Sequence, residues 1–156
     1  MKKRNKGFTL AEVVITLSIS IIVVVLISTL IVMISKMSKR IEYENLCQTE
    51  YKQASELVLD YSNAYSINIF TVKSVADNQI VVTNGETDYR LSFDTSNGNL
   101  LAETFNYTTN TLDTLEKTFK NIVNIKFTAQ DNIVLCEYSF KNYPTYTNII
   151  KFGASE

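Results

Sequence analysis

The sequence contains no histidine, and this absence excludes much of the chemistry that small proteins perform. Without imidazole there is no histidine general base, no Ser-His-Asp or Cys-His nucleophile and no histidine-ligated zinc. Two cysteines are too few to hold a zinc ion by thiolates alone, and the four glycines form no phosphate-binding loop. We therefore expect a protein that is not an enzyme and that binds no cofactor and no metal.

Proline and glycine are also scarce, and neither occurs between Phe8 and Gly85. Nothing in that stretch breaks a helix locally. Its first part, Phe8–Ile34, has 27 residues, of which only Glu12 is charged. As a helix this run would be roughly 40 Å long, whereas the hydrocarbon core of a bilayer is about 30 Å thick. The run is thus predicted to be a single membrane-spanning helix.

Glu12 needs an explanation, because an ionised carboxylate in hydrocarbon normally has a partner. No cation lies within the apolar run. One interpretation is that Glu12 lies near the interface and reaches the headgroups. The other starts from the basic flank that precedes Gly7, namely Lys2, Lys3, Arg4 and Lys6. If the chain is cut after Gly7, Phe8 gains an α-amino group that Glu12 of the same chain or of a neighbour could reach.

The stretch from Lys6 to Leu17 reads K-G-F-T-L-A-E-V-V-I-T-L and is followed by the rest of the apolar run. It resembles the class III signal sequence of type IV pilins and pseudopilins. The resemblance implies that a prepilin peptidase cleaves between Gly7 and Phe8 on the cytoplasmic side and methylates the Phe8 amine. It also implies that Glu12 contacts the Phe8 amine of a neighbouring subunit during assembly. A secretory signal fits less well, because the apolar run is far longer than an h-region of about 7–15 residues.

The same resemblance implies three segments: a leader at residues 1–7, a transmembrane and assembly helix at 8–34, and an extracytoplasmic pilin-like domain at 35–156. The chain would be anchored in the cytoplasmic membrane with its N-terminus in the cytoplasm, and would reach the cell surface when assembled. Its partners would be other pilin or pseudopilin subunits, the prepilin peptidase and an assembly platform protein. The charge bias supports this orientation only weakly, because Lys36, Lys39 and Arg40 follow the helix.

The charge of the chain argues against nucleic acid as a direct partner. Removal of the four leader cations leaves 11 basic and 16 acidic residues, a net charge of −5. Broad electrostatic capture of nucleic acid needs a basic surface. We therefore expect no direct nucleic-acid binding.

The helix is expected to continue beyond Ile34 to about residue 63. Apolar residues recur there at mainly three- and four-residue steps and form a single stripe: Met37, Ile41, Cys47, Tyr51, Ala54, Val58, Tyr61 and Tyr65. An alternative is two helices hinged near Ser35–Ser38. Either way, the first half is apolar on all sides and the second half on one side, which suits a helix that leaves a membrane and packs on its own domain.

After Ile67 the pattern changes to short β segments separated by turn residues. The candidate strands are Ile67–Val75, Gln79–Thr83, Tyr89–Asp94, Leu100–Phe105, Val123–Ala129, Ile133–Phe140 and Asn148–Phe152. Asn84-Gly85 and Asn97-Gly98 are the strongest hairpin signals. Leu112, Leu115 and Phe119 predict a short helical turn within Thr108–Asn121. The fold class is therefore α+β: a long N-terminal helix packed by its second half on a C-terminal antiparallel sheet, which also resembles the pilin fold.

One departure from the family pattern concerns the apolar helix. Major pilins and pseudopilins typically have a proline about two-thirds of the way along it, often with a glycine before it, whereas this chain has Ile21 and Thr29 at those places. The resemblance is therefore closer to a minor pilin or minor pseudopilin. Such a subunit would serve DNA uptake in competence, type II-like protein secretion or adhesion. The alternative is a membrane-anchored extracytoplasmic binding domain outside any filament.

Two further features have open alternatives. Cys47 and Cys136 could form a disulfide outside the cytoplasm, or could be two buried free thiols that pack as small apolar residues. The tyrosines and phenylalanines favour a small aromatic core over an interaction surface. The segment Tyr143–Tyr146 is the best candidate for an exposed aromatic loop.

Overall fold

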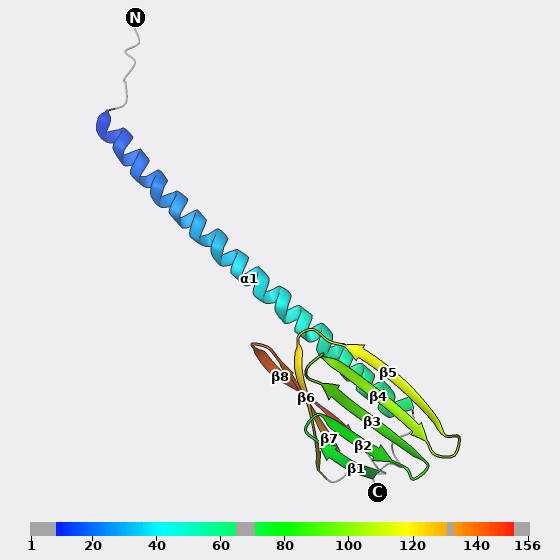
Figure 1. Ribbon diagram of the computed structural model, residues 1–156. Helices are drawn as coiled ribbons and strands as arrows, with labels where there is room; N and C mark the ends of the chain where they lie inside the picture. Colours follow the sequence, from blue (N-terminus) through cyan, green and yellow to red (C-terminus); the bar gives the residue numbers. More distant parts are fainter. Residues whose placement is uncertain (1–8, 65–70, 131–132, 152–156) are drawn as a thin grey trace, which may run out of the picture. The chain divides into compact units, whose positions relative to one another are not determined.

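The computed structural model describes residues 9–64, 71–130 and 133–151 (Figure 1). The chain divides into two compact units, Met1–Tyr43 and Glu44–Glu156, which we treat separately. The helix α1, Leu10–Ala64, supplies nearly all of the described part of the first unit and the opening segment of the second. Its end agrees with the predicted end near residue 63. Ser35–Ser38 are helical, so the alternative of two helices hinged there is wrong.

The strands of the second unit form two antiparallel sheets. The five-stranded sheet has the order β1-β2-β3-β4-β5 and the three-stranded sheet the order β6-β7-β8 (Figure 1). The strands are β1 (Thr71–Ala76), β2 (Gln79–Thr83), β3 (Thr87–Asp94), β4 (Asn99–Asn106), β5 (Thr111–Thr118), β6 (Ile122–Gln130), β7 (Ile133–Phe140) and β8 (Tyr143–Lys151). The α+β class is confirmed, while the expected single sheet is corrected to two.

The predicted helical turn within Thr108–Asn121 is wrong, because this region contains β5. All eight residues of β5 pair with β4, from Asn106↔Thr111 to Asn99↔Thr118. The turn before it is fixed by Asn106, whose side-chain oxygen accepts the backbone N–H groups of Thr108 and Thr109, and by Asn110 with a positive φ of 53°. The spacing of the apolar residues is typical of a helix, but the hydrogen-bonded turn at Asn106–Asn110 and pairing with β4 determine the structure.

The last predicted strand also began too late, since β8 starts at Tyr143 instead of Asn148. β8 lies at the edge of its sheet, and edge strands tolerate a proline such as Pro144 near their start. The expected exposed loop at Tyr143–Tyr146 is therefore part of a strand. Both tyrosine rings are half-buried and contact each other at 5.8 Å between centroids. The start of the first predicted strand, at Ile67, lies outside the described residues.

The core of the second unit lies where the helical segment meets the inner faces of the sheets. Cys47, Ala54 and Val58 of α1 are fully buried, and the alternate residues of β3 and β7 are buried as well. Tyr51 lies edge-on to Tyr138 at 5.2 Å and stacks on Tyr146 at 4.7 Å. The expected aromatic core is thus present between the helix and the three-stranded sheet.

A carboxylate of the helix fastens the connection between the two sheets. Glu50 accepts the backbone N–H groups of Lys120 at 3.2 Å, Asn121 at 2.9 Å and Ile122 at 3.2 Å. It also accepts the side-chain amide of Asn121 at 2.9 Å. Hydrogen bonds to an ionised acceptor are stronger than neutral ones. Glu50 therefore holds the segment that leaves β5 and enters β6 against the helix.

Candidate functional site

The N-terminal end of α1 is a reciprocal capping box made by Thr9 and Glu12. The Thr9 backbone N–H and hydroxyl both donate to Glu12 Oε2, at 2.9 Å and 3.0 Å. In return, the Glu12 backbone N–H donates to Thr9 Oγ1 at 3.3 Å. Two backbone donors at the helix start are satisfied in this way. The Glu12 carboxylate thus has polar partners within its own chain, three residues away.

The capping role of Thr9 was not predicted from the sequence. The signal was present, because Thr-x-x-Glu before an apolar run is the sequence signature of a capping box. A carboxylate in the first turn is also favoured by the helix dipole. Gly7 and Phe8, the predicted cleavage and methylation residues, lie outside the described residues. The contact between Glu12 and the Phe8 amine therefore stays a prediction.

From Leu10 to Ile34 the helix exposes apolar side chains in all directions, and its side-chain hydroxyls are bonded within the helix. Every large apolar side chain of this stretch is exposed, by 44 to 83%. The hydroxyls of Thr16, Ser18, Ser20, Ser28 and Thr29 donate to carbonyl oxygens three or four residues earlier, at 2.6 to 2.9 Å. No water is needed to satisfy them, which suits hydrocarbon. Within the described residues, α1 is the one helix long and apolar enough to cross a membrane.

Cys47 and Cys136 are both buried in the structure, and no disulfide joins them. The residues that neighbour Cys136 in the sheet contact α1 at Tyr51 and beyond it, whereas Cys47 precedes Tyr51. Tyr51 packs on Tyr138, whereas Ser55, one turn further along the helix, accepts a 2.7 Å hydrogen bond from Asn148, the neighbour of Cys136 in the sheet. Cys47 lies one turn before Tyr51.

The helix rises about 12 Å between Cys47 and Ser55, at 1.5 Å per residue, which agrees with the absence of a disulfide between the two cysteines. Burial also raises the pKa of the Cys136 thiol to about 12. The packing therefore favours the alternative of two free thiols that act as small apolar residues.

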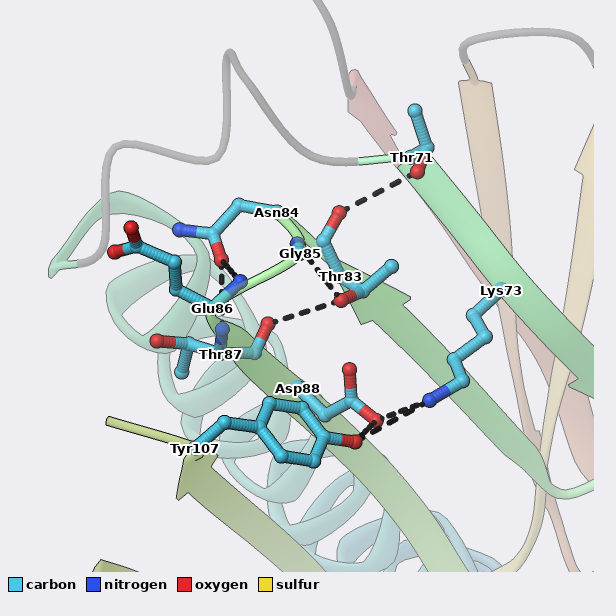
Figure 2. Close-up of polar contacts among 9 residues, drawn as sticks. All are labelled: Thr71, Lys73, Thr83, Asn84, Gly85, Glu86, Thr87, Asp88 and Tyr107. Carbon is cyan, nitrogen blue, oxygen red and sulfur yellow. Dashed lines mark hydrogen bonds and ion pairs between the residues drawn. The ribbon is translucent and has the colours of Figure 1, made fainter. Parts of the chain in front are cut away.

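A connected polar cluster of the second unit lies on the five-stranded sheet (Figure 2). Asp88 Oδ2 accepts the ammonium of Lys73 at 2.6 Å and the hydroxyl of Tyr107 at 2.7 Å. Lys73 is the extra residue at a register shift of β1, and a bulge of this kind re-aims a side chain. Burial opposes ionisation of Asp88, but hydrogen bonds from Lys73, Thr83 and Tyr107 together lower its pKa below the ordinary value.

The neighbouring β2–β3 turn is also self-contained (Figure 2). Asn84 Oδ1 accepts the backbone N–H groups of Glu86 at 3.0 Å and Thr87 at 2.7 Å, and Gly85 has a positive φ of 91°. This confirms the predicted Asn-Gly turn. Most polar groups of the cluster and the turn bind one another, which is a structural role, whereas Asp88 Oδ1 is buried without a hydrogen-bond partner among the described residues. In the part of the chain that the structure describes, no group of three His, Cys, Asp or Glu residues could hold a metal ion.

Residues 2–28 match a family model described as the prokaryotic N-terminal methylation motif. This motif marks the prepilin-type proteins, the type IV pilins and pseudopilins, and the long apolar helix that follows it agrees with that match. The α+β layout is pilin-like as well. No curated protein and no solved structure matches the chain.

Proposed function

We propose that this chain, which carries the N-terminal methylation motif of type IV pilins and pseudopilins, is a structural subunit of a pilus-like or pseudopilus filament. The observation that carries the proposal is the motif at residues 2–28, joined to a helix whose first 25 described residues expose an apolar surface apart from Glu12, with internally bonded hydroxyls. A surface of that kind is stable in a bilayer or against the same surface of neighbouring subunits.

The processing reaction acts on the N-terminal segment. Prepilin peptidase removes residues 1–7 by cleaving between Gly7 and Phe8, and the new Phe8 amine is methylated. Residues 8–34 then serve as the transmembrane and assembly helix, and residues 35–156 as the extracytoplasmic domain. The N-terminus lies in the cytoplasm, and an assembly platform protein takes up the processed subunit together with other pilins or pseudopilins.

In this scheme, Glu12 pairs with the methylated amine of a neighbouring subunit and so sets the register between them. The capping box supports a two-step view of this pairing. In the isolated subunit, Thr9 supplies two donors to the carboxylate. An ammonium group from a neighbour is a stronger partner than a hydroxyl, because both groups of the pair are charged. Assembly would therefore replace or extend the Thr9 contacts.

We further propose that the subunit is a minor one. The apolar run contains neither proline nor glycine, so it has no site for the kink that major subunits typically have. The machine it serves, for DNA uptake, type II-like secretion or adhesion, is best identified from the proteins that co-purify with it. An anchored binding domain outside any filament remains the competing function, and it predicts an uncut N-terminus.

Intact mass measurement of the chain extracted from its native membranes tests the proposal. We expect loss of Met1–Gly7 and gain of one methyl group. We also expect Glu12→Val to insert and be processed normally but to be depleted from sheared filaments, with Glu42→Gln as a control. An uncut chain beside processed sister subunits would refute the proposed function, and normal filament content of Glu12→Val would refute the pairing role.

A further inference from the structure

A basic face follows directly after the apolar part of α1. Lys36, Lys39 and Arg40 are three and four residues apart, so they lie on one side of the helix. All three side chains are exposed in the structure. The nearest acidic residue of this unit is Glu42, which lies about 120° around the helix from Lys36 and three residues beyond Lys39. We call Lys36 and Lys39 the juxtamembrane lysines.

The juxtamembrane lysines lie at the depth of lipid headgroups if the apolar run spans the bilayer with Ile34 at the edge of the hydrocarbon. With a rise of 1.5 Å per residue, Lys36 is about 3 Å and Lys39 about 8 Å beyond Ile34 along the axis. The headgroup layer extends roughly 5–8 Å beyond the hydrocarbon on each side. The flexible stems of both lysines allow their ammonium groups to adjust within that layer.

The position of these cations is not explained by membrane orientation. Basic residues are enriched on the cytoplasmic side of a span, and here the leader supplies four of them at the opposite end. After cleavage at Gly7, the flanking cations of the span would all lie at its C-terminal end. A cationic face at headgroup depth is complementary to one abundant kind of partner, the phosphate of anionic phospholipids.

We infer that Lys36 and Lys39 bind the headgroup phosphates of anionic phospholipids in the leaflet at the C-terminal end of the span. This contact fixes the depth of the helix before assembly and must be released when the subunit leaves the bilayer. The inference rests on the membrane insertion proposed above. It does not depend on cleavage or on filament formation.

The test uses the full chain reconstituted into phosphatidylcholine vesicles that contain a trace of spin-labelled phosphatidylglycerol or spin-labelled phosphatidylcholine. The fraction of each label that is motionally restricted by the protein gives their relative association. We expect a preference for phosphatidylglycerol that falls at least about threefold in Lys36→Gln/Lys39→Gln. The leader cations are the same in all variants, so the difference reports the two lysines.

Two controls match the double variant. Lys52→Gln removes an exposed lysine far along the helix, and Glu42→Gln removes the neighbouring acidic charge without touching the lysines. Glutamine is a good helix former, so none of these changes should break α1, and circular dichroism checks this. We expect both controls to keep the preference, and about 0.5 M NaCl to weaken it, because exposed charges are screened.

A decrease in the double variant no larger than in Lys52→Gln would overturn the inference. So would a loss of self-association in the double variant without any change in lipid preference, since the lysines would then pair with carboxylates of a second copy. An uncut N-terminus in native membranes would refute the proposed filament function and leave this result unaffected.

Discussion

The two units of this chain treat apolar side chains in opposite ways. Between Leu10 and Ile34, valine, leucine and isoleucine are exposed throughout and every side-chain hydroxyl bonds to its own helix. From Glu44 onward, many apolar residues are buried between helix and sheets, and in β3 and β7 they alternate with less buried residues. The first region has no tertiary contacts to specify it, so its environment must come from lipid or from other subunits. The second region is specified by its own turns and contacts.

This difference predicts that single substitutions in the second unit change its stability, whereas single substitutions in the first unit change assembly. The largest effect on stability is expected at Gly98, which has a positive φ of 71°. A Cβ there would lie 2.2 Å from the carbonyl oxygen of Phe119, a residue that is itself buried. Since backbone must move, we expect Gly98→Ala to lower the free energy of unfolding by about 3–4 kcal/mol.

The matched control is Gly85→Ala. Gly85 also has a positive φ, of 91°, but nothing lies within 4 Å of its added Cβ. The change should therefore have only the conformational effect of about 1–2 kcal/mol. Urea unfolding of the detergent-solubilised chain, followed by circular dichroism of the strands, measures both. Equal losses at the two glycines would show that the contact with Phe119 relaxes freely.

The next largest effect is expected at Glu50, which anchors the connection between the two sheets. Glu50→Ala leaves three backbone N–H groups without their acceptor, and we expect a loss of about 2–3 kcal/mol in the same unfolding measurement. Glu50→Gln keeps one acceptor oxygen and should lose less. Glu56→Ala removes an exposed carboxylate that faces Lys52 at 3.8 Å, and should change stability by less than about 0.5 kcal/mol. A Glu50 variant as stable as the Glu56 variant would contradict the anchoring role.

Sequence patterns predicted the first unit better than the second, and the reason is physical. A helix that is apolar on all sides is determined by local hydrogen bonds and by side-chain polarity, so the helix of the first unit could be predicted from its residues. Hairpins with Asn-Gly turns could also be predicted, because glycine supplies the positive φ that the turn requires. The helical turn predicted from the spacing of Leu112, Leu115 and Phe119 was wrong, because pairing with a neighbouring strand outweighs local periodicity.

Polar contacts also differ in whether the sequence predicts them, because local contacts leave a sequence pattern and long-range contacts do not. Thr9 could have been found from its Thr-x-x-Glu pattern, because a capping box is local. Glu50 meets residues that are 70 to 72 positions away, and no local signal marks such a contact. The turn of Lys73 toward Asp88 depends on a register shift between two strands, which the alternation of residue types did not reveal. Interactions that depend on how separate elements pack need the structure.

A smaller effect on stability is expected in the first unit at Thr9, because Thr9 stabilises only the first turn of α1. Thr9→Val removes the hydroxyl that accepts from and donates to Glu12, at a cost of about 1 kcal/mol to the first turn. Thr9→Ser keeps the capping oxygen and serves as the control. We expect faster amide hydrogen exchange at Glu12 and Val13 in micelles for Thr9→Val alone, with global unfolding unchanged. If both variants exchange as the parent does, the first turn does not depend on the capping box.

The smallest effect is expected at Asp88, where a substitution distinguishes the contribution of a polar contact from that of the apolar packing in the second unit. The pKa of Asp88 is lowered in the folded protein, so its ionised form stabilises the fold at neutral pH. That contribution is lost as the pH falls below the ordinary aspartate value of 3.8 and through the lower folded value. Because Lys73 is half exposed, we expect less than about 1 kcal/mol. Asp88→Asn should therefore be slightly less stable than the parent at pH 7 and should lose less stability on acidification to pH 3, as measured by urea unfolding at the two pH values. Equal losses of stability on acidification in parent and variant would mean that the cluster of Lys73, Asp88 and Tyr107 contributes through its shape and packing and not through the charge of Asp88.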